Sequence, residues 1–193
     1  MRAALGDIAA ATEAMRSGDR ERRLVISLLP SFAARWLTPR IDNFIEQYPE
    51  IDVELQFTHT ITDFSLDDVD VVLRFGHDNH PGLLAEHLLD AVFFPACAPT
   101  YNCGRLPKAP SDLASVTVLR NDYEMWHAWF AAAGLEGWKE PRRGVLYQGA
   151  SQQMQAVMDG QGVGLVRRSL AMQEIVNGRL VRLFDIEARS PWT

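Results

Sequence analysis

The chain has 193 residues, of which 47% are hydrophobic and 23% charged, and its formal net charge at pH 7 is -6. This balance excludes a disordered or fibrous chain and is sufficient for one domain or two small lobes. An acidic chain lacks the positive surface that grips nucleic-acid phosphates, and two cysteines are too few for a disulfide scaffold. No apolar run approaches the roughly 18 residues of a membrane-spanning helix. We therefore expect a cytoplasmic protein that has no membrane association.

Residues 1–18 are predicted to form a short helical stub. They are rich in alanine, and Leu5, Ile8, Thr12 and Met15 fall on one helical face at spacings of three and four residues. A Ser-Gly pair ends the pattern, and a charged run follows. The apolar stripe requires a partner.

Residues 24–92 are predicted to form a first α/β lobe. Residues 24–29 and 71–75 are apolar enough to be buried parallel strands, whereas residues 53–57 alternate like a half-exposed strand. The order strand, helix, strand implies a right-handed parallel crossover between the first two strands.

The intervening helix contains a proline. Apolar residues recur at helical spacing from Leu37 to Tyr48, and Pro39 fits if the helix begins near Thr38, because the first turn needs no N–H at that position. Residues 31–37 are then a turn or a separate short helix.

An apolar segment at 91–99 follows the first lobe. Because Pro95 and Pro99 interrupt it, and proline cannot donate to a strand ladder, it is interpreted as a connector between two lobes.

Residues 93–182 are predicted to form a second α/β lobe, and residues 183–193 a return segment towards the first lobe. Apolar runs predict strands, and patterns of helical period with glycine stops predict helices. The predicted strands are 116–119, 144–148, 162–166 and 179–184, and the predicted helices are 122–133, one from 151 onwards, and 168–176.

Several tempting motifs have ordinary explanations. The glycines of GQGVG (160–164) close a helix and enter a strand, the reverse of a dinucleotide loop, so they predict a helix stop and close packing. His77, Asp78, His80 and His87 form no zinc-like spacing, and Cys97 and Cys103 form no CxxC pair. Neither GxSxG nor HExxH occurs. We predict no cofactor, no metal and no catalysis.

Polar groups recur where the predicted strands end, which is where open α/β sheets bind ligands. The candidate effector-binding residues are Ser31, Phe32, His59, Thr60, Arg74, Phe75, Gly76, Asn121, Trp126, Gln148 and Ser151. Arg74 favours a carboxylate-bearing ligand unless it pairs with Asp63 or another acid. The alternative for each Ser or Thr is a helix cap.

An ordered set of segments carries a family resemblance. PSFAARWLTPRIDNFIEQYPEIDVEL is followed by DVDVVLRFG, PGLLAEHLLD, FFPACAPTY, GQGVGL and NGRLVRLF. The set resembles the effector-binding domain of LysR-type transcriptional regulators, in particular the branch of the glycine-cleavage and β-lactamase-gene activators. The resemblance implies a two-lobed, Rossmann-like fold of the type 2 periplasmic-binding-protein kind, with a small-molecule effector in the interlobe cleft.

The resemblance also implies partners. Relatives dimerise through helices that here correspond to residues 38–47 and 151–159, and they bind DNA only through an N-terminal helix-turn-helix domain that this chain lacks. The stub then corresponds to the end of the linker helix. Residues 148–151 depart from the family pattern, so the identity of the effector cannot be transferred. The alternative functions are a transport-type solute receptor, a small α/β enzyme, or a remnant that only dimerises.

Overall fold

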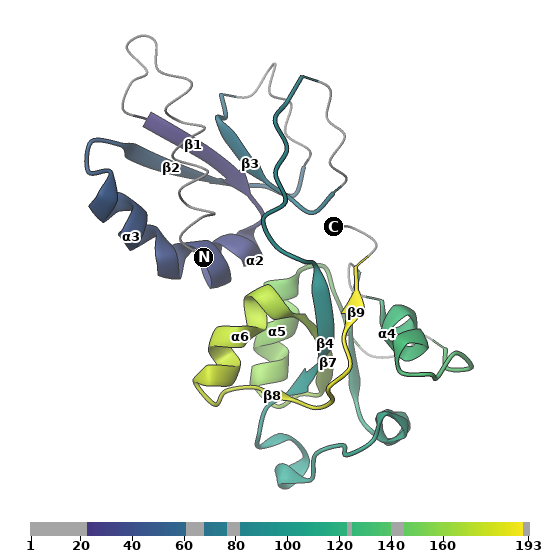
Figure 1. The fold of residues 1–193 in the computed structure, drawn as a ribbon. Helices are drawn as coiled ribbons and strands as arrows, with labels where there is room; N and C mark the ends of the chain where they lie inside the picture. Colours follow the sequence, from purple (N-terminus) through teal and green to yellow (C-terminus); the bar gives the residue numbers. More distant parts are fainter. Residues whose placement is uncertain (1–22, 61–67, 77–81, 123–124, 140–144, 191–193) are drawn as a thin grey trace. The chain divides into compact units, whose positions relative to one another are not determined.

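A computed structural model describes residues 23–60, 68–76, 82–122, 125–139 and 145–190 (Figure 1). The chain divides into two compact units, Met1–Phe75 and Gly76–Thr193, here called unit 1 and unit 2. The predicted stub, residues 1–18, lies outside the described residues.

Unit 1 contains a parallel sheet of three strands in the order β2-β1-β3. The strands are β1 (Arg23–Leu28), β2 (Asp52–Phe57) and β3 (Val71–Leu73). The central strand β1 is buried from Leu24 to Leu28, as its apolar run predicts. The edge strand β3 is half-buried rather than buried, and it ends at Leu73, so Arg74 and Phe75 follow the strand.

The helical segment of unit 1 shows how Pro39 is accommodated. The segment consists of α2 (Pro30–Phe32), the π-helical turn η1 (Ala33–Leu37) and α3 (Thr38–Gln47). α3 begins at Thr38, as predicted, but η1 leads into it without a break. The Thr38 N–H reaches back to the carbonyl of Ala33, and Arg40 Nη1 donates to the carbonyl of Trp36 at 2.8 Å. The wider turn therefore carries the proline within a longer helical run.

Unit 2 contains a mixed sheet in the order β6-β5-β7-β4-β8, with β9 also paired to β4. β4 is antiparallel to β7, β8 and β9, whereas β5 is parallel to β6 and β7. The strands are β4 (Val92–Cys97), β5 (Val118–Asn121), β6 (Leu146–Tyr147), β7 (Val163–Arg167), β8 (Val181–Arg182) and β9 (Ala188–Arg189).

The interpretation of residues 91–99 as a connector is wrong, because residues 92–97 within this segment form the fully buried strand β4. Pro95 is tolerated for a positional reason. β9 pairs with Val92 and Phe93, and β8 pairs with Ala96 and Cys97, so Pro95 faces the gap between these two partners. Its carbonyl accepts from the Leu183 N–H at 3.1 Å, and its missing N–H interrupts neither ladder.

The helices of unit 2 lie on both faces of its sheet, with α5 and α6 on one side of β4 and α4 on the other (Figure 1). They are α4 (Trp126–Ala132), α5 (Ala150–Met158) and α6 (Arg168–Val176), and two 3₁₀ turns are η2 (Tyr101–Gly104) and η3 (Pro110–Ser115). α6 has the predicted bounds. α4 begins four residues later than predicted, and β5 lies two residues later, so Asn121 ends the strand rather than following it.

The core of unit 2 is aromatic. Trp126, Trp129 and Phe130 of α4 are buried, and Trp129 stacks on Phe184 with ring centroids 5.5 Å apart. The indole N–H of Trp129 donates to the carbonyl of Ile186 at 3.1 Å. The segment between β8 and β9 is therefore attached to the core, and β9, which the sequence did not predict, follows it.

Candidate functional site

Arg74 lies at the carboxyl edge of the sheet in unit 1, immediately after β3. Its Nη1 donates to the carbonyl of Thr58 at 2.6 Å, and its Nη2 donates to the carbonyl of Thr60 at 3.0 Å and to Ser27 Oγ at 3.4 Å. Its Nε is buried and has no hydrogen-bond partner among the described residues. These acceptors belong to β1 and to the loop after β2, so Arg74 contacts both neighbouring parts of the sheet edge.

The electrostatics of Arg74 follow from this environment. Burial lowers the pKa of its guanidinium from the ordinary value, because desolvation disfavours the charged form. Its three acceptors are neutral oxygens, and no carboxylate among the described residues pairs with it. Asp63, the acid considered as its partner, lies outside the described residues. Among the described residues, the positive charge is therefore not neutralised by an acid.

The loop after β2 carries two predicted site residues. His59 and Thr60 are exposed. The Thr60 N–H donates to Thr58 Oγ1 at 3.0 Å, and the two threonine hydroxyl oxygens lie 2.6 Å apart. The loop is thus bonded to itself as well as to Arg74.

Two of the remaining predicted residues near this edge, Phe32 and Phe75, are aromatic. Phe32 is buried and stacks on Trp36 at 4.9 Å, and it meets Phe75 edge to face at 6.4 Å. Ser31, in the short helix α2, is half-buried, and so is Gly76. Phe32 and Phe75 are therefore in contact at the base of the edge, and Phe32 belongs to the core.

A buried polar cluster lies at the end of β5 in unit 2. Asn121 Nδ2 donates to Gln153 Oε1 at 3.4 Å, and Gln153 Nε2 donates to the carbonyl of Leu119 at 3.3 Å. The same carbonyl accepts from Trp126 Nε1 at 2.9 Å. Asn121 and Trp126, both predicted as site residues, are brought together by Gln153, which the sequence did not single out. The sequence signal that could have identified Gln153 is the position of a glutamine on the buried face of an amphipathic helix.

The other two residues of unit 2 lie at the start of α5. Ser151 is half-buried in its first turn, and Gln148 is exposed just ahead of the helix. The N-cap residue is Gly149, which makes no side-chain cap, so the alternative interpretation of Ser151 as a helix cap does not apply to this helix. Ser151 is one residue inside the helix.

The remaining motifs have structural explanations. A Cβ on Gly162 would lie 2.6 Å from the carbonyl oxygen of Thr117, and Gly160 has φ +74°, so these glycines serve close packing and the helix stop. Asp70, just ahead of β3, accepts from the Val25 N–H at 2.8 Å. The described residues contain no group of three His, Cys, Asp or Glu side chains suited to a metal. Within that part of the chain, no helix is long and apolar enough to cross a membrane.

Two mixed α/β units, one with a parallel sheet and the other with a β4-centred mixed sheet, define the type 2 periplasmic-binding-protein-like class of ligand-binding proteins. The effector domain of the regulator AmpR from Pseudomonas aeruginosa superposes with a TM-score of 0.75 at 26% identity, over 88% of this chain and 82% of that one. The chain belongs to the LysR substrate binding domain family, whose pattern matches residues 17–193.

Two further similarities agree with this family. The glycine cleavage system transcriptional activator of Escherichia coli (strain K12) is 37% identical over 177 residues, which are 91% of this chain and 58% of that protein. The HTH-type transcriptional activator AmpR of Citrobacter koseri is 29% identical over 185 residues, which are 95% of this chain and 64% of that protein. The chain thus spans less than two thirds of the length of either relative.

Proposed function

We propose that this chain is the effector-sensing part of a LysR-type transcriptional regulator that acts in the cytoplasm. The observation that carries the proposal is the family match over residues 17–193, joined to relatives that are named as transcriptional activators. These relatives support a binding role without catalysis, and they do not support the transport receptor or the enzyme. Polar groups at the ends of strands in both units add support, since this is where α/β sheets bind ligands.

The proposed ligand is a small molecule with an anionic group. The exposed groups available to it are His59, Thr60 and Gln148, with the half-buried Ser31 and Ser151. Arg74 supplies positive charge, and the half-buried Phe75 and Gly76 lie beside it in the chain. The buried Phe32, Asn121 and Trp126 would support the binding residues of their own units from the core. That a single effector contacts both units remains a prediction. The protein is proposed to need no cofactor or metal.

The proposed organisation follows the family. Residues 24–92 and 93–182 form the two lobes, and 183–193 returns towards the first. Two copies associate through residues 38–47 and 151–159, where α3 exposes Asp42, Ile45 and Glu46. DNA is bound through a helix-turn-helix domain outside this chain.

The proposed mechanism is a shift between conformations. An effector can change the equilibrium only by its differential affinity for the two states, and a coupling of about 1–3 kcal/mol changes occupancy several-fold. That change is passed to DNA through the associated copies, and no bond in the effector is broken.

A thermal-shift screen of small carboxylic acids and amino acids tests the proposal. An effector at about 100 times its dissociation constant adds about 2.7 kcal/mol of stability, which is a readily measured rise in Tm. Ser151→Ala should reduce the response, whereas Ser111→Ala, at an exposed serine of η3, should not. A panel without any response would contradict effector sensing. Sequence-specific DNA retardation by this chain at near-physiological salt would contradict the separate DNA-binding domain.

A further inference from the structure

One guanidinium connects the ends of all three strands in unit 1. Arg74 follows β3, its acceptor Ser27 belongs to β1, and its acceptors Thr58 and Thr60 belong to the loop after β2. Parallel strands end at the same sheet edge, so these contacts fix the relative position of the segments that would face a ligand there.

The pattern of donors leaves Arg74 poorly suited to grip a carboxylate directly. An arginine has two bidentate forks, one formed by Nη1 with Nη2 and the other by Nε with Nη2, so each requires an N–H of Nη2. Nη2 has two such groups, and they have the two acceptors Thr60 O and Ser27 Oγ. Nε is buried. A ligand could therefore occupy a fork only by displacing the loop or Ser27.

The loop itself is preorganised and accessible. The Thr60 N–H is directed to Thr58 Oγ1, and the Thr58 N–H donates to the carbonyl of Leu28 at 3.1 Å, which continues the β1–β2 pairing. The side chains of His59 and Thr60 remain exposed. The loop thus presents the exposed side chains of His59 and Thr60 next to a positive charge that the described residues do not neutralise.

We propose that Arg74 is a positioning residue of the effector site, which fixes the loop 58–60 so that the anionic group of the effector bonds to this loop and not to a guanidinium fork. The inference rests on the proposed function for the presence of an effector. The conformation of the loop 58–60 does not depend on the proposed function.

Amide hydrogen exchange of the ligand-free chain tests the positioning. Loss of the two carbonyl contacts in Arg74→Lys and Arg74→Ala should accelerate exchange at Thr60 by about tenfold or more, because the loop then opens without unfolding the sheet. Arg23→Lys is the matched control, since Arg23 lies on the same sheet at the opposite end and pairs with Glu54 and Asp68. Unchanged exchange at Thr60 in both Arg74 variants would overturn the proposal. This result is independent of any ligand.

Acetate, titrated at constant ionic strength with chloride as the reference anion, separates positioning from direct contact. Lysine keeps the positive charge, but its single ammonium group cannot replace the guanidinium as donor to the separate acceptors of Thr58, Thr60 and Ser27. Arg74→Lys should therefore lose the acetate response to the same extent as Arg74→Ala, while Arg23→Lys retains it. A response preserved by lysine and lost with alanine would show direct binding and overturn the proposal. If acetate does not bind the wild-type chain, the exchange experiment alone decides the role of Arg74.

Discussion

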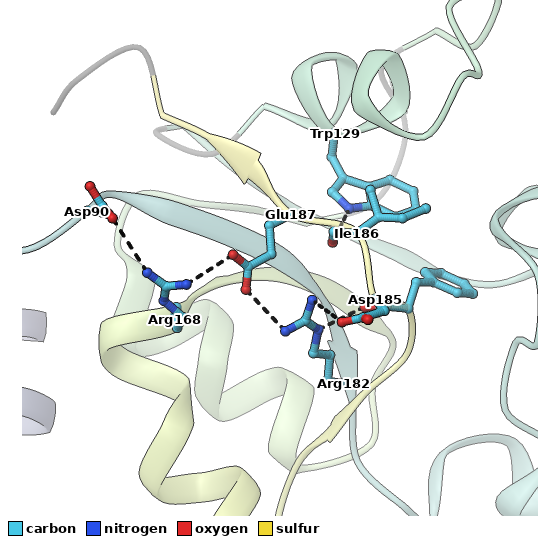
Figure 2. A network of polar contacts seen from close by, with 8 residues as sticks. Asp90, Trp129, Arg168, Arg182, Asp185, Ile186 and Glu187 are labelled. Carbon is cyan, nitrogen blue, oxygen red and sulfur yellow. Dashed lines mark hydrogen bonds and ion pairs between the residues drawn. The ribbon is translucent and has the colours of Figure 1, made fainter.

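Arg182, on β8, and Glu187, ahead of β9, form a hydrogen-bonded ion pair in which Nη1 and Oε1 lie 3.1 Å apart (Figure 2). The other carboxylate oxygen, Oε2, accepts from Arg168 Nη1 at 3.1 Å, and Arg168 Nη2 lies 3.9 Å from Asp90 Oδ2. The start of α6, β8 and the segment before β9 are therefore joined through Glu187, and Arg168 extends the network to the segment before β4. The Ser190 N–H donates to the carbonyl of Ala91 at 2.7 Å in the same region.

Replacing this central carboxylate should weaken unit 2. Glu187→Gln keeps the shape but removes both charge-assisted hydrogen bonds, and because Arg168 and Arg182 are partly exposed, the expected loss is about 1 kcal/mol in the free energy of unfolding. Urea denaturation measures it.

Asp185→Asn is the matched control. Asp185 is fully exposed and pairs with Arg182 at 3.0 Å, so its loss should cost clearly less stability than the loss of Glu187. Equal effects of the two substitutions would contradict a central role for Glu187.

Gly164 on β7 is required for the close approach of α5. A Cβ at this position would lie 2.5 Å from Val157 Cγ2, inside the buried core. Gly164→Ala should therefore reduce the free energy of unfolding by about 1–3 kcal/mol through overpacking. Gly137→Ala, where a Cβ would meet nothing within 4 Å, should be close to neutral.

A double variant identifies the cause of that loss. Val157→Ala removes the obstructing methyl group, so in the Gly164→Ala background it should cost less than it does alone. Strictly additive losses in chemical denaturation would show that the Val157 contact is not the source of the strain.

The sequence predicts the elements of both units because hydrophobic period and glycine stops are local signals. α6 and its end at Gly178, with φ +70°, required no tertiary information. The local structure around the two prolines was harder to predict from the sequence. Pro39 is carried by a π turn, and Pro95 lies opposite a gap between two strands, so in each case the surrounding hydrogen bonds decide the outcome rather than the residue itself.

The candidate site could be predicted only in part, because it also depends on contacts between residues that are distant in the chain. The ends of strands could be located along the chain, and the residues after them named. The acceptors of Arg74 and the position of Gln153 between Asn121 and Leu119 depend on which segments meet in space. A buried polar group is selected by its partners, which are distant in sequence.

The two cysteines should differ sharply in reactivity. Cys97 is buried on β4, and burial raises the pKa of its thiol to about 11, whereas Cys103 is exposed. Thiolate is the reactive form, so a thiol reagent at pH 8 should modify Cys103 in the folded chain and leave Cys97 unmodified until the chain unfolds. Mass spectrometry after a short labelling pulse measures the site, and rapid labelling of both would contradict the burial of Cys97.

The same shift predicts a pH dependence of stability. Between about pH 9 and pH 11 the unfolded chain loses the Cys97 proton while the folded chain keeps it, so the folded state binds more protons and stability falls as the pH rises. Cys97→Ala should lower stability overall but reduce this decline. Urea midpoints at pH 8 and pH 10.5 provide the comparison, and an identical decline in wild type and variant would contradict the prediction.

Gln153→Glu tests whether the buried amide holds the end of β5 through its donor. Gln153 Nε2 donates to the carbonyl of Leu119, and an ionised carboxylate placed there would face that oxygen without a proton to share. Burial raises the pKa of such a carboxyl group above its unfolded value, so the variant should be most stable below about pH 4 to 5 and lose stability as the pH rises towards 8. Gln152→Glu, on the exposed side of α5, should show no comparable decline relative to wild type. Since a protonated carboxyl can still donate to Leu119, a Gln153→Glu loss that is equally large at pH 5 and pH 8 would mean that packing, rather than this hydrogen bond, fixes α5 against β5.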